Sequence, residues 1–225
     1  MAADPYVEPV PLAFAGPDQK PPGRYQKGIR RRQEIIEAAS SVFAEFGYSG
    51  GSIRTIAERV GVSPPTLLQH FGCKEGLLTA VLDDWLYQQR QHAASRGEGR
   101  RGLAFFNRMR SVMRYHITHR GLIELFLTMA TEASSSTHPA RAFIQHRYDS
   151  SLDEARMRLR EAIADHEIQP MSDAEIDRET RVLFAVMDGL ELQWLLNPDI
   201  DLVQLFDDWL DATIAQWGGA RASLD

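Results

Sequence analysis

The sequence has only one cysteine, Cys73, among its 225 residues. A disulfide within the chain is therefore excluded, which favours a reducing compartment, the cytoplasm. No apolar stretch approaches the roughly 18 residues of a membrane span, and the N-terminal residues lack the basic segment and apolar core of a signal peptide. We therefore expect a soluble cytoplasmic protein without a membrane partner.

Signatures of catalysis are also missing. The chain has no Gly-rich phosphate loop, no G-x-S-x-G and no H-E-x-x-H. His116 and His119 lie one helical turn apart, but a metal site needs further ligands. Cys73 precedes Lys74 at an expected helix start, where a redox-sensitive thiol is conceivable and a plain helix cap is the simpler interpretation. We expect no enzyme, no cofactor and no bound metal.

Proline is scarce beyond the first 23 residues, which hold six of the eleven prolines. Alternation of apolar and polar residues with period two is scarce as well. Residues 1–23 show no amphipathic period and are expected to form a disordered tail. The rest has apolar residues at three- and four-residue steps, which predicts an all-α fold. We expect a three-helix helix-turn-helix domain over residues 24–73 and a larger helical body over residues 74–225.

The helix boundaries follow from capping and breaking residues. A helix of about twenty residues is expected from Arg24 to Gly47, a short one after Ser52, and a long one from Lys74 to Ser95. Because a residue before proline avoids the α region, we expect Pro64 outside the third helix and Pro65 as its first residue. Body helices are expected within 102–119, 121–133, 139–166, 173–196 and 200–217.

Charge separates the same two parts. The net charge is −6, yet residues 24–74 carry eight Lys and Arg against four acidic residues. A basic segment on an acidic body is typical of a DNA-binding head, although a solvated helix face also gives local charge. Within this segment, Arg24, Lys27 and Arg30–Arg32 form a basic run that either contacts phosphates or is simply solvated.

The spacing around Gly61 favours a helix-turn-helix over an ordinary corner between two helices. Ala57 falls where the two helices must approach, and Gly61 falls at the tight turn. The residues expected to face the shared core are Ile56, Val60, Val62 and Leu67.

The stretch EIIEAASSVFAEFGYSGGSIRTIAERVGVSPPTLLQHFGCKEGLLTAVL, which ends at Leu82, resembles the N-terminal domain of the TetR family of transcriptional regulators. The segment DGLELQWLLNPDIDL is similar to actinobacterial members. The resemblance implies a homodimer that binds a palindromic double-stranded DNA operator, with an effector-binding helical body. The sequence departs from the family pattern at four positions. Pro64, Pro65, Leu68 and Cys73 stand where lysine, glycine, tyrosine and serine, respectively, are frequent.

The resemblance and the basic run together predict the DNA-facing residues. These are Arg30, Ser52, Arg54, Ser63, Pro64, Pro65, Thr66, Leu68, Gln69, His70 and Lys74. Our hypothesis is that Pro64 or Pro65 packs on a thymine methyl or a sugar, while Thr66, Gln69 and His70 supply polar readout and Gln69 pairs with adenine. The alternative is that the prolines only start the helix.

The body residues are assigned more broadly. Candidate effector contacts are Met109, Met113, His116, Glu124, Thr128, Phe143, Arg147 and Met187, although the bulky apolar ones fit a core equally well. The candidate dimer seam, which the resemblance places on the last two helices, comprises Leu183, Leu190, Trp194, Leu205, Phe206 and Trp209.

We therefore expect a repressor that an unknown small-molecule effector releases from its operator. Two alternatives remain open at this point. One is a regulator of the same type without a small-molecule effector, which acts as an activator or under the control of a protein. The other is a helical small-molecule-binding protein that does not bind DNA.

Overall fold

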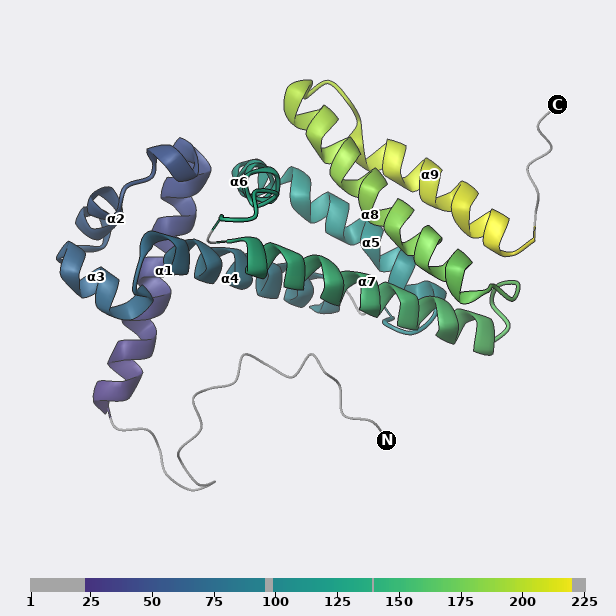
Figure 1. Cartoon of the computed structure of the whole chain (residues 1–225), viewed down its shortest axis with the longest axis horizontal. Coiled ribbons are helices and arrows are strands. Elements are labelled where there is room, and N and C mark those ends of the chain that lie inside the picture. The colour runs from purple at the N-terminus through teal and green to yellow at the C-terminus, as the bar shows by residue number, and fades with distance from the viewer. Residues whose placement is uncertain (1–22, 96–98, 139, 220–225) are drawn as a thin grey trace.

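A computed structural model describes residues 23–95, 99–138 and 140–219; the expected tail therefore lies almost entirely outside the described residues. The described ranges are helical and contain no strand, which confirms the all-α prediction. Figure 1 shows α1 to α3 at one end of the molecule and α5, α7, α8 and α9 at the other, with α4 running between the two ends. The helices are α1 (Gly23–Gly50), α2 (Ile53–Val60), α3 (Pro64–Phe71), α4 (Lys74–Ser95), α5 (Leu103–Ile117), α6 (Arg120–Glu132), α7 (Arg141–Ala164), α8 (Asp173–Leu196) and α9 (Leu202–Trp217).

The predicted helices all occur, and α1 is longer than expected. Its helical geometry is interrupted at Gly47, whose φ of 69° is left-handed, and a last turn then continues to Gly50. Glycine adopts this conformation without the steric cost that other residues incur. Gly47 thus interrupts the helical geometry where the helix was expected to stop, but one more turn follows before α1 ends at Gly50.

The expected start of α3 was wrong by one residue. Pro64 is the first residue of α3 and Pro65 the second. Ser63 takes the extended conformation that a residue before proline prefers, and its Oγ accepts the N–H of Thr66 at 3.3 Å. Both prolines therefore occupy positions whose missing N–H groups the helix does not need.

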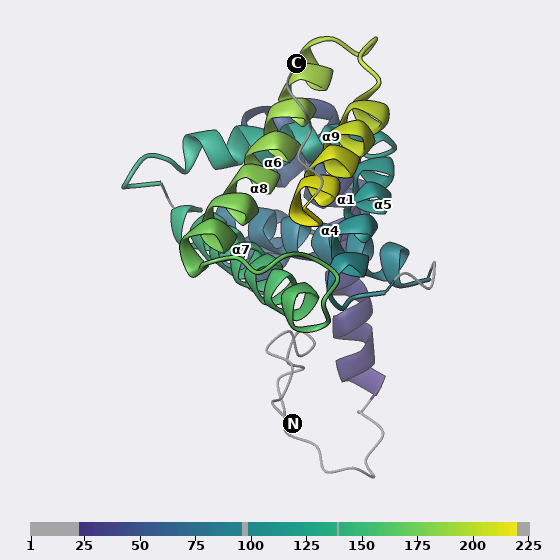
Figure 2. The same cartoon turned by 90° about the vertical axis from the view of Figure 1, so that its right-hand side faces the viewer.

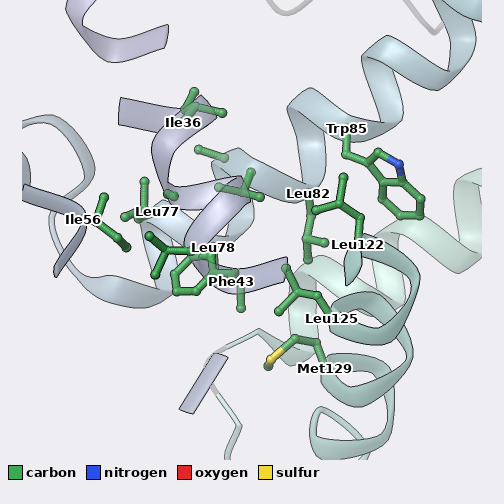
Figure 3. Packing of buried hydrophobic residues seen from close by; sticks show 14 of the residues in the cluster. Ile36, Phe43, Ile56, Leu77, Leu78, Leu82, Trp85, Leu122, Leu125 and Met129 are labelled. Carbon is green, nitrogen blue, oxygen red and sulfur yellow. The ribbon is translucent and has the colours of Figure 1, made fainter. Parts of the chain in front are cut away.

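Two hydrophobic cores hold the helices together. The first joins α1 to α4 with α6 and the first turn of α7, and Figure 3 shows Phe43, Leu82 and Leu122 among its side chains. The second joins α5, α7, α8 and α9 around Phe106, Leu183 and Phe206. Because the first core crosses residue 74, the division of the chain into two domains at that point stays a prediction.

Helix α6 approaches α1 closely at Gly121. A Cβ added to Gly121 of α6 would lie 2.6 Å from Ala44 Cβ and 2.7 Å from Ala44 O on α1. The preceding residue fixes α6 to α8, since Arg120 donates to Leu195 O at 2.6 Å and its guanidinium lies 5.0 Å from the ring centroid of Trp194. One end of α6 therefore touches both α8 and α1.

We predict that Gly121→Ala lowers the free energy of unfolding by about 1–3 kcal/mol, because a methyl group has no room against the α1 backbone. Gly28→Ala is the matched control, since a Cβ at Gly28 of α1 meets nothing within 4 Å. It should stabilise the protein by roughly 0.5–1 kcal/mol. Urea unfolding monitored by circular dichroism measures both, and an equal effect of the two variants would contradict the close contact.

Candidate nucleic-acid interface and buried polar cluster

The turn between α2 and α3 has the geometry of a helix-turn-helix. Ser52 caps α2 by accepting the N–H of Thr55 at 3.0 Å. Gly61 ends α2 with a left-handed φ of 66°, and the N–H of Val62 then donates to Ala57 O at 3.0 Å. Ala57 is fully buried where the helices meet. The two caps fix α3 relative to α2, which is what a rigid reading helix requires.

The outer face of α3 is exposed, and its first turn is poor in hydrogen-bond donors. Pro64, Pro65, Leu68, Gln69 and His70 all face solvent. The two prolines have no N–H, and the next N–H, on Thr66, is used by the Ser63 cap. The Thr66 hydroxyl also lies 2.8 Å from the Ser63 hydroxyl. The start of α3 therefore offers little to a phosphate, unlike most helix N-termini.

The basic residues near α3 have different surroundings. Arg30 and Arg54 are exposed, with Glu34 and Glu58 beside them at 3.6 and 2.8 Å. Solvent screens such pairs, so both guanidinium groups stay available to a phosphate.

Two neighbouring arginines help to hold the head together. Arg31 donates to Val60 O of α2 at 3.3 Å, and the Arg32 guanidinium lies 5.0 Å from the Phe71 ring centroid of α3. Lys27 and Arg30 of the basic run are exposed, while the Arg24 side chain lies outside the described residues.

Lys74 has an internal role that the sequence did not predict. Its Nζ donates to Tyr48 O at 2.6 Å and lies 4.3 Å from the Tyr48 ring centroid. Burial lowers the pKa of Lys74. The Tyr48 hydroxyl donates to Glu75 Oε1 at 2.8 Å, so Tyr48 is held from both sides. A phosphate contact by Lys74 would require it to exchange this bond.

Cys73 acts as a helix cap. The N–H of Gly76 donates to Cys73 Sγ at 3.4 Å at the start of α4, and the side chain is exposed. This is the simpler of the two roles that its position in the sequence allows.

The candidate effector residues fall into three places. His116 is buried on α5, and Met109, Met113 and Met187 belong to the second core. Phe143 and Arg147 are half-buried on α7, and the Arg147 guanidinium lies 4.4 Å from the Phe126 ring centroid. Glu124 and Thr128 are exposed on α6 and do not join the others.

His116 is the centre of a buried polar cluster, which we define as Gln89, His116, Tyr148, Asp188 and Glu191. His116 and Glu191 are each 3% exposed. His116 Nδ1 lies 2.5 Å from Glu191 Oε1. The amide nitrogen of Gln89 lies 2.8 Å from His116 Nε2. If Gln89 donates, Nε2 accepts, and the ring proton sits on Nδ1, where it is donated to Glu191.

The second pair of the cluster is Tyr148 and Asp188. The Tyr148 hydroxyl donates to Asp188 Oδ2 at 2.5 Å. Burial raises the pKa of Asp188 to about 6, outweighing this hydrogen bond, which lowers it; the Glu191 charge raises it further. Burial also raises the pKa of the Tyr148 hydroxyl.

Aromatic rings lie against the cluster. The Trp85 ring centroid is 5.3 Å from that of His116 and 6.2 Å from that of Phe126, which in turn is 6.2 Å from Tyr148. Trp85 is 3% exposed, and its buried Nε1 has no hydrogen-bond partner among the described residues. The body therefore brings acids, an imidazole and aromatic rings from α4 to α8 into one region.

Sequence reasoning found His116 but missed Gln89, Tyr148, Asp188 and Glu191. A signal was present for two of them. Glu191 interrupts the apolar stripe of Met187 and Trp194, and Gln89 follows Trp85 by one turn on the buried face of α4. A polar residue in register with a buried stripe requires a partner inside the protein.

Most residues of the expected dimer seam are covered by the chain itself. Leu183 and Phe206 are fully buried in the chain's own second core, and Trp194 is nearly so. Leu190 and Trp209 are half-buried, and only Leu205 is exposed, at 46%. The inner stripe of α8 packs on α5, α7 and α9 of the same chain, so it is not the face available to a second copy.

A second stripe faces outward on α8. Figure 2 views the molecule from the side on which α8 and α9 lie next to each other. Leu196 is 79% exposed and Leu192 51% exposed. The outer stripe, as we name it, comprises Val182, Ala185, Gly189, Leu192 and Leu196, all at three- and four-residue steps.

Two other kinds of site are absent from the ranges that the structure describes. Nowhere in those ranges do three or more His, Cys, Asp or Glu side chains gather as metal ligands would. None of the helices described is long and apolar enough to span a membrane.

Known proteins resemble this chain along most of its length. Residues 35–81 match the model of the family described as bacterial regulatory proteins, tetR family. The HTH-type transcriptional regulator TtgR of Pseudomonas putida is 26% identical over 196 residues, which cover 80% of this chain and 88% of that protein.

Solved structures share the fold. SmeT, the repressor of the Stenotrophomonas maltophilia multidrug efflux pump SmeDEF, has a TM-score of 0.63 and 21% identity over 86% of this chain and 94% of its own. The Bacillus subtilis regulator FadR, solved with stearoyl-CoA, has a TM-score of 0.61 and 23% identity over 81% of this chain and 97% of its own.

The raised pKa of Asp188 predicts a pH-dependent stability. Between the ordinary value of 3.8 and about 6 the folded protein holds a proton that the unfolded chain has released. The stability that this proton contributes is present at low pH and is lost as the pH rises through about 6.

We therefore expect the free energy of unfolding of the wild type, relative to Asp188→Asn, to fall between pH 4 and pH 7 and then to level off. Denaturant unfolding at several pH values measures it. Asp149→Asn, which changes an exposed acid on α7 next to Tyr148, is the control. Parallel curves for wild type and Asp188→Asn would refute the assignment.

Proposed function

Because the chain belongs to the TetR family of transcriptional regulators, we propose that it is a repressor that binds a palindromic operator as a homodimer. In this proposal a small molecule that binds the helical body releases the protein from DNA. The observation that carries the proposal is the exposed outer face of α3, held by two capped helices on a basic head.

DNA contacts divide into reading and anchoring. In helix-turn-helix proteins the second helix of the motif enters the major groove. In this chain that helix is α3, which carries Gln69 and His70. A glutamine pairs with adenine through two hydrogen bonds. Arg30, Arg54 and the N-terminus of α2 at Ser52 are the proposed phosphate contacts. Pro64, Pro65, Thr66 and Leu68 complete the proposed reading face.

Dimerisation is proposed through the outer stripe of α8 and the exposed side of α9. A row of apolar side chains in water is what a second copy would cover. Ala185 and Gly189 occupy the middle of the row, and a Cβ at Gly189 would meet nothing within 4 Å. Small residues there would let two α8 helices approach closely, while Leu192, Leu196 and Leu205 would supply apolar area. A two-fold axis through this seam would require an operator with the same symmetry.

Release requires the body to act on the head. The buried polar cluster is the proposed effector region, together with Met109, Met113, Phe143, Arg147 and Met187. A ligand there must favour one separation of the two heads over another, since equal affinity for both would change nothing. The contacts of α6 with α8 and with α1 give a physical connection between the body and the head. SmeT controls an efflux pump and FadR was solved with a ligand, which supports this assignment by analogy.

The proposed operator can be found directly. Purified protein is selected against a random duplex library, and binding of the enriched sequence is followed across salt concentrations. We expect an inverted repeat whose half-site centres lie one helical turn apart, about 34–36 Å, or slightly more. Affinity should fall steeply with salt, as phosphate contacts release counterions. Equal, weak binding to all sequences would contradict the proposal.

The outer stripe predicts the oligomeric state. Leu192→Glu should convert the dimer to a monomer, because it places a carboxylate on each side of the two-fold seam. Operator affinity should then fall at least about tenfold, because each protomer binds its half-site separately. Sedimentation velocity and fluorescence anisotropy measure the two effects. Tyr87→Glu, at an exposed position on α4, is the control. A dimeric Leu192→Glu protein would rule this seam out.

A further inference from the structure

The outer edge of α3 is apolar, although a helix that reads DNA needs side chains that can recognise the base edges. Pro64, Pro65 and Leu68 lie at relative positions zero, one and four, which places them on one side of the helix. All three are exposed, and Leu68 is 36% exposed although Leu67 beside it is fully buried. We name these three residues the apolar edge.

Several polar groups at the same place already have partners within the protein. The first free N–H of α3 donates to Ser63 Oγ, and the Thr66 and Ser63 hydroxyls bond to each other. Lys74, the nearest lysine along the chain, is bonded to Tyr48. Pro64, Pro65 and Leu68 themselves offer no side-chain donor to a phosphate or a base oxygen, and the two prolines also lack an N–H.

The partner of such an edge must be apolar and must lie in a negatively charged polymer, because the surrounding head is basic. In the major groove of B-DNA the only apolar group on a base edge is the C5-methyl of thymine. Gln69 projects next to Leu68, and an A·T pair presents both an adenine edge for an amide and a methyl for an apolar side chain.

We propose that the apolar edge of α3 recognises thymine methyl groups, so that the operator half-site contains A·T pairs whose methyls are required for full affinity. The inference rests on the proposed DNA-binding function and names the chemistry that α3 reads. Packing of the prolines on a deoxyribose, the competing arrangement, would not depend on the methyl.

Deoxyuridine provides the test, because it pairs as thymidine does and lacks only the methyl group. In the operator found by selection, each thymidine is replaced singly by deoxyuridine, and the dissociation constant is measured by fluorescence anisotropy at fixed salt. One methyl buried against the edge corresponds to about a fourfold change in affinity. We expect this loss at one or two thymidines of each half-site and no loss at thymidines outside the half-sites.

The protein variants locate the effect on the edge. Leu68→Ala and Pro65→Ala are exposed substitutions, whose folding is checked by circular dichroism. We expect at least one of them to bind the thymidine and deoxyuridine operators equally at the sensitive position. Tyr87→Ala should keep the parent's discrimination.

The outcomes separate the two proposals. If the wild type binds its selected operator and tolerates deoxyuridine everywhere, or if both edge variants discriminate as the parent does, thymine recognition by this edge is refuted and the DNA-binding function stands. If no sequence is enriched, the proposed function itself fails.

Discussion

The structure depends on the close approach of α6 to α1 at Gly121. Any side chain there would meet the backbone of α1 at Ala44, so the two helices pack almost backbone to backbone. Around this contact the first core joins the helix-turn-helix to α4 and α6. Interiors packed in this way transmit displacements instead of absorbing them. A shift of α6 would therefore move the head.

The same end of α6 also contacts the body. Arg120 holds α6 to the C-terminal turn of α8, and α8 carries both Glu191 of the buried polar cluster and the outer stripe. One helix thus presents its inner side to a polar cluster and its outer side to solvent. In the proposed regulator, the effector region, the dimer seam and the connection to the head would all share α8.

Local signals in the sequence were enough for the head. Caps at Ser52 and Ser63, the left-handed Gly61 and the three- and four-residue apolar steps act within a few residues, and they predicted α2 and α3 closely. The position of Pro64 was wrong because the rule for a residue before proline was outweighed by the favourable cap at Ser63. Which residues of the head contact DNA stays a prediction.

Long-range packing was beyond the reach of the sequence. Helix α8 carries two apolar stripes, and its composition does not say which faces inward: the buried one includes Thr180 and Glu191, while Leu192 and Leu196 are exposed. The dimer prediction consequently chose buried residues such as Leu183. The cluster around His116 was missed for a similar reason, since its partners Gln89 and Glu191 lie 27 and 75 positions away along the chain.

The central claim is that the position of the head follows the body through α6 and α1. Cys73, the only cysteine, is exposed at the start of α4 and can carry a spin label. The distance between the labels of a dimer, measured by pulsed electron paramagnetic resonance, reports the separation of the heads. We expect operator DNA to narrow the distribution to one separation, and Gly121→Ala to displace the distribution in the free dimer. Identical distributions in all three samples would contradict the claim.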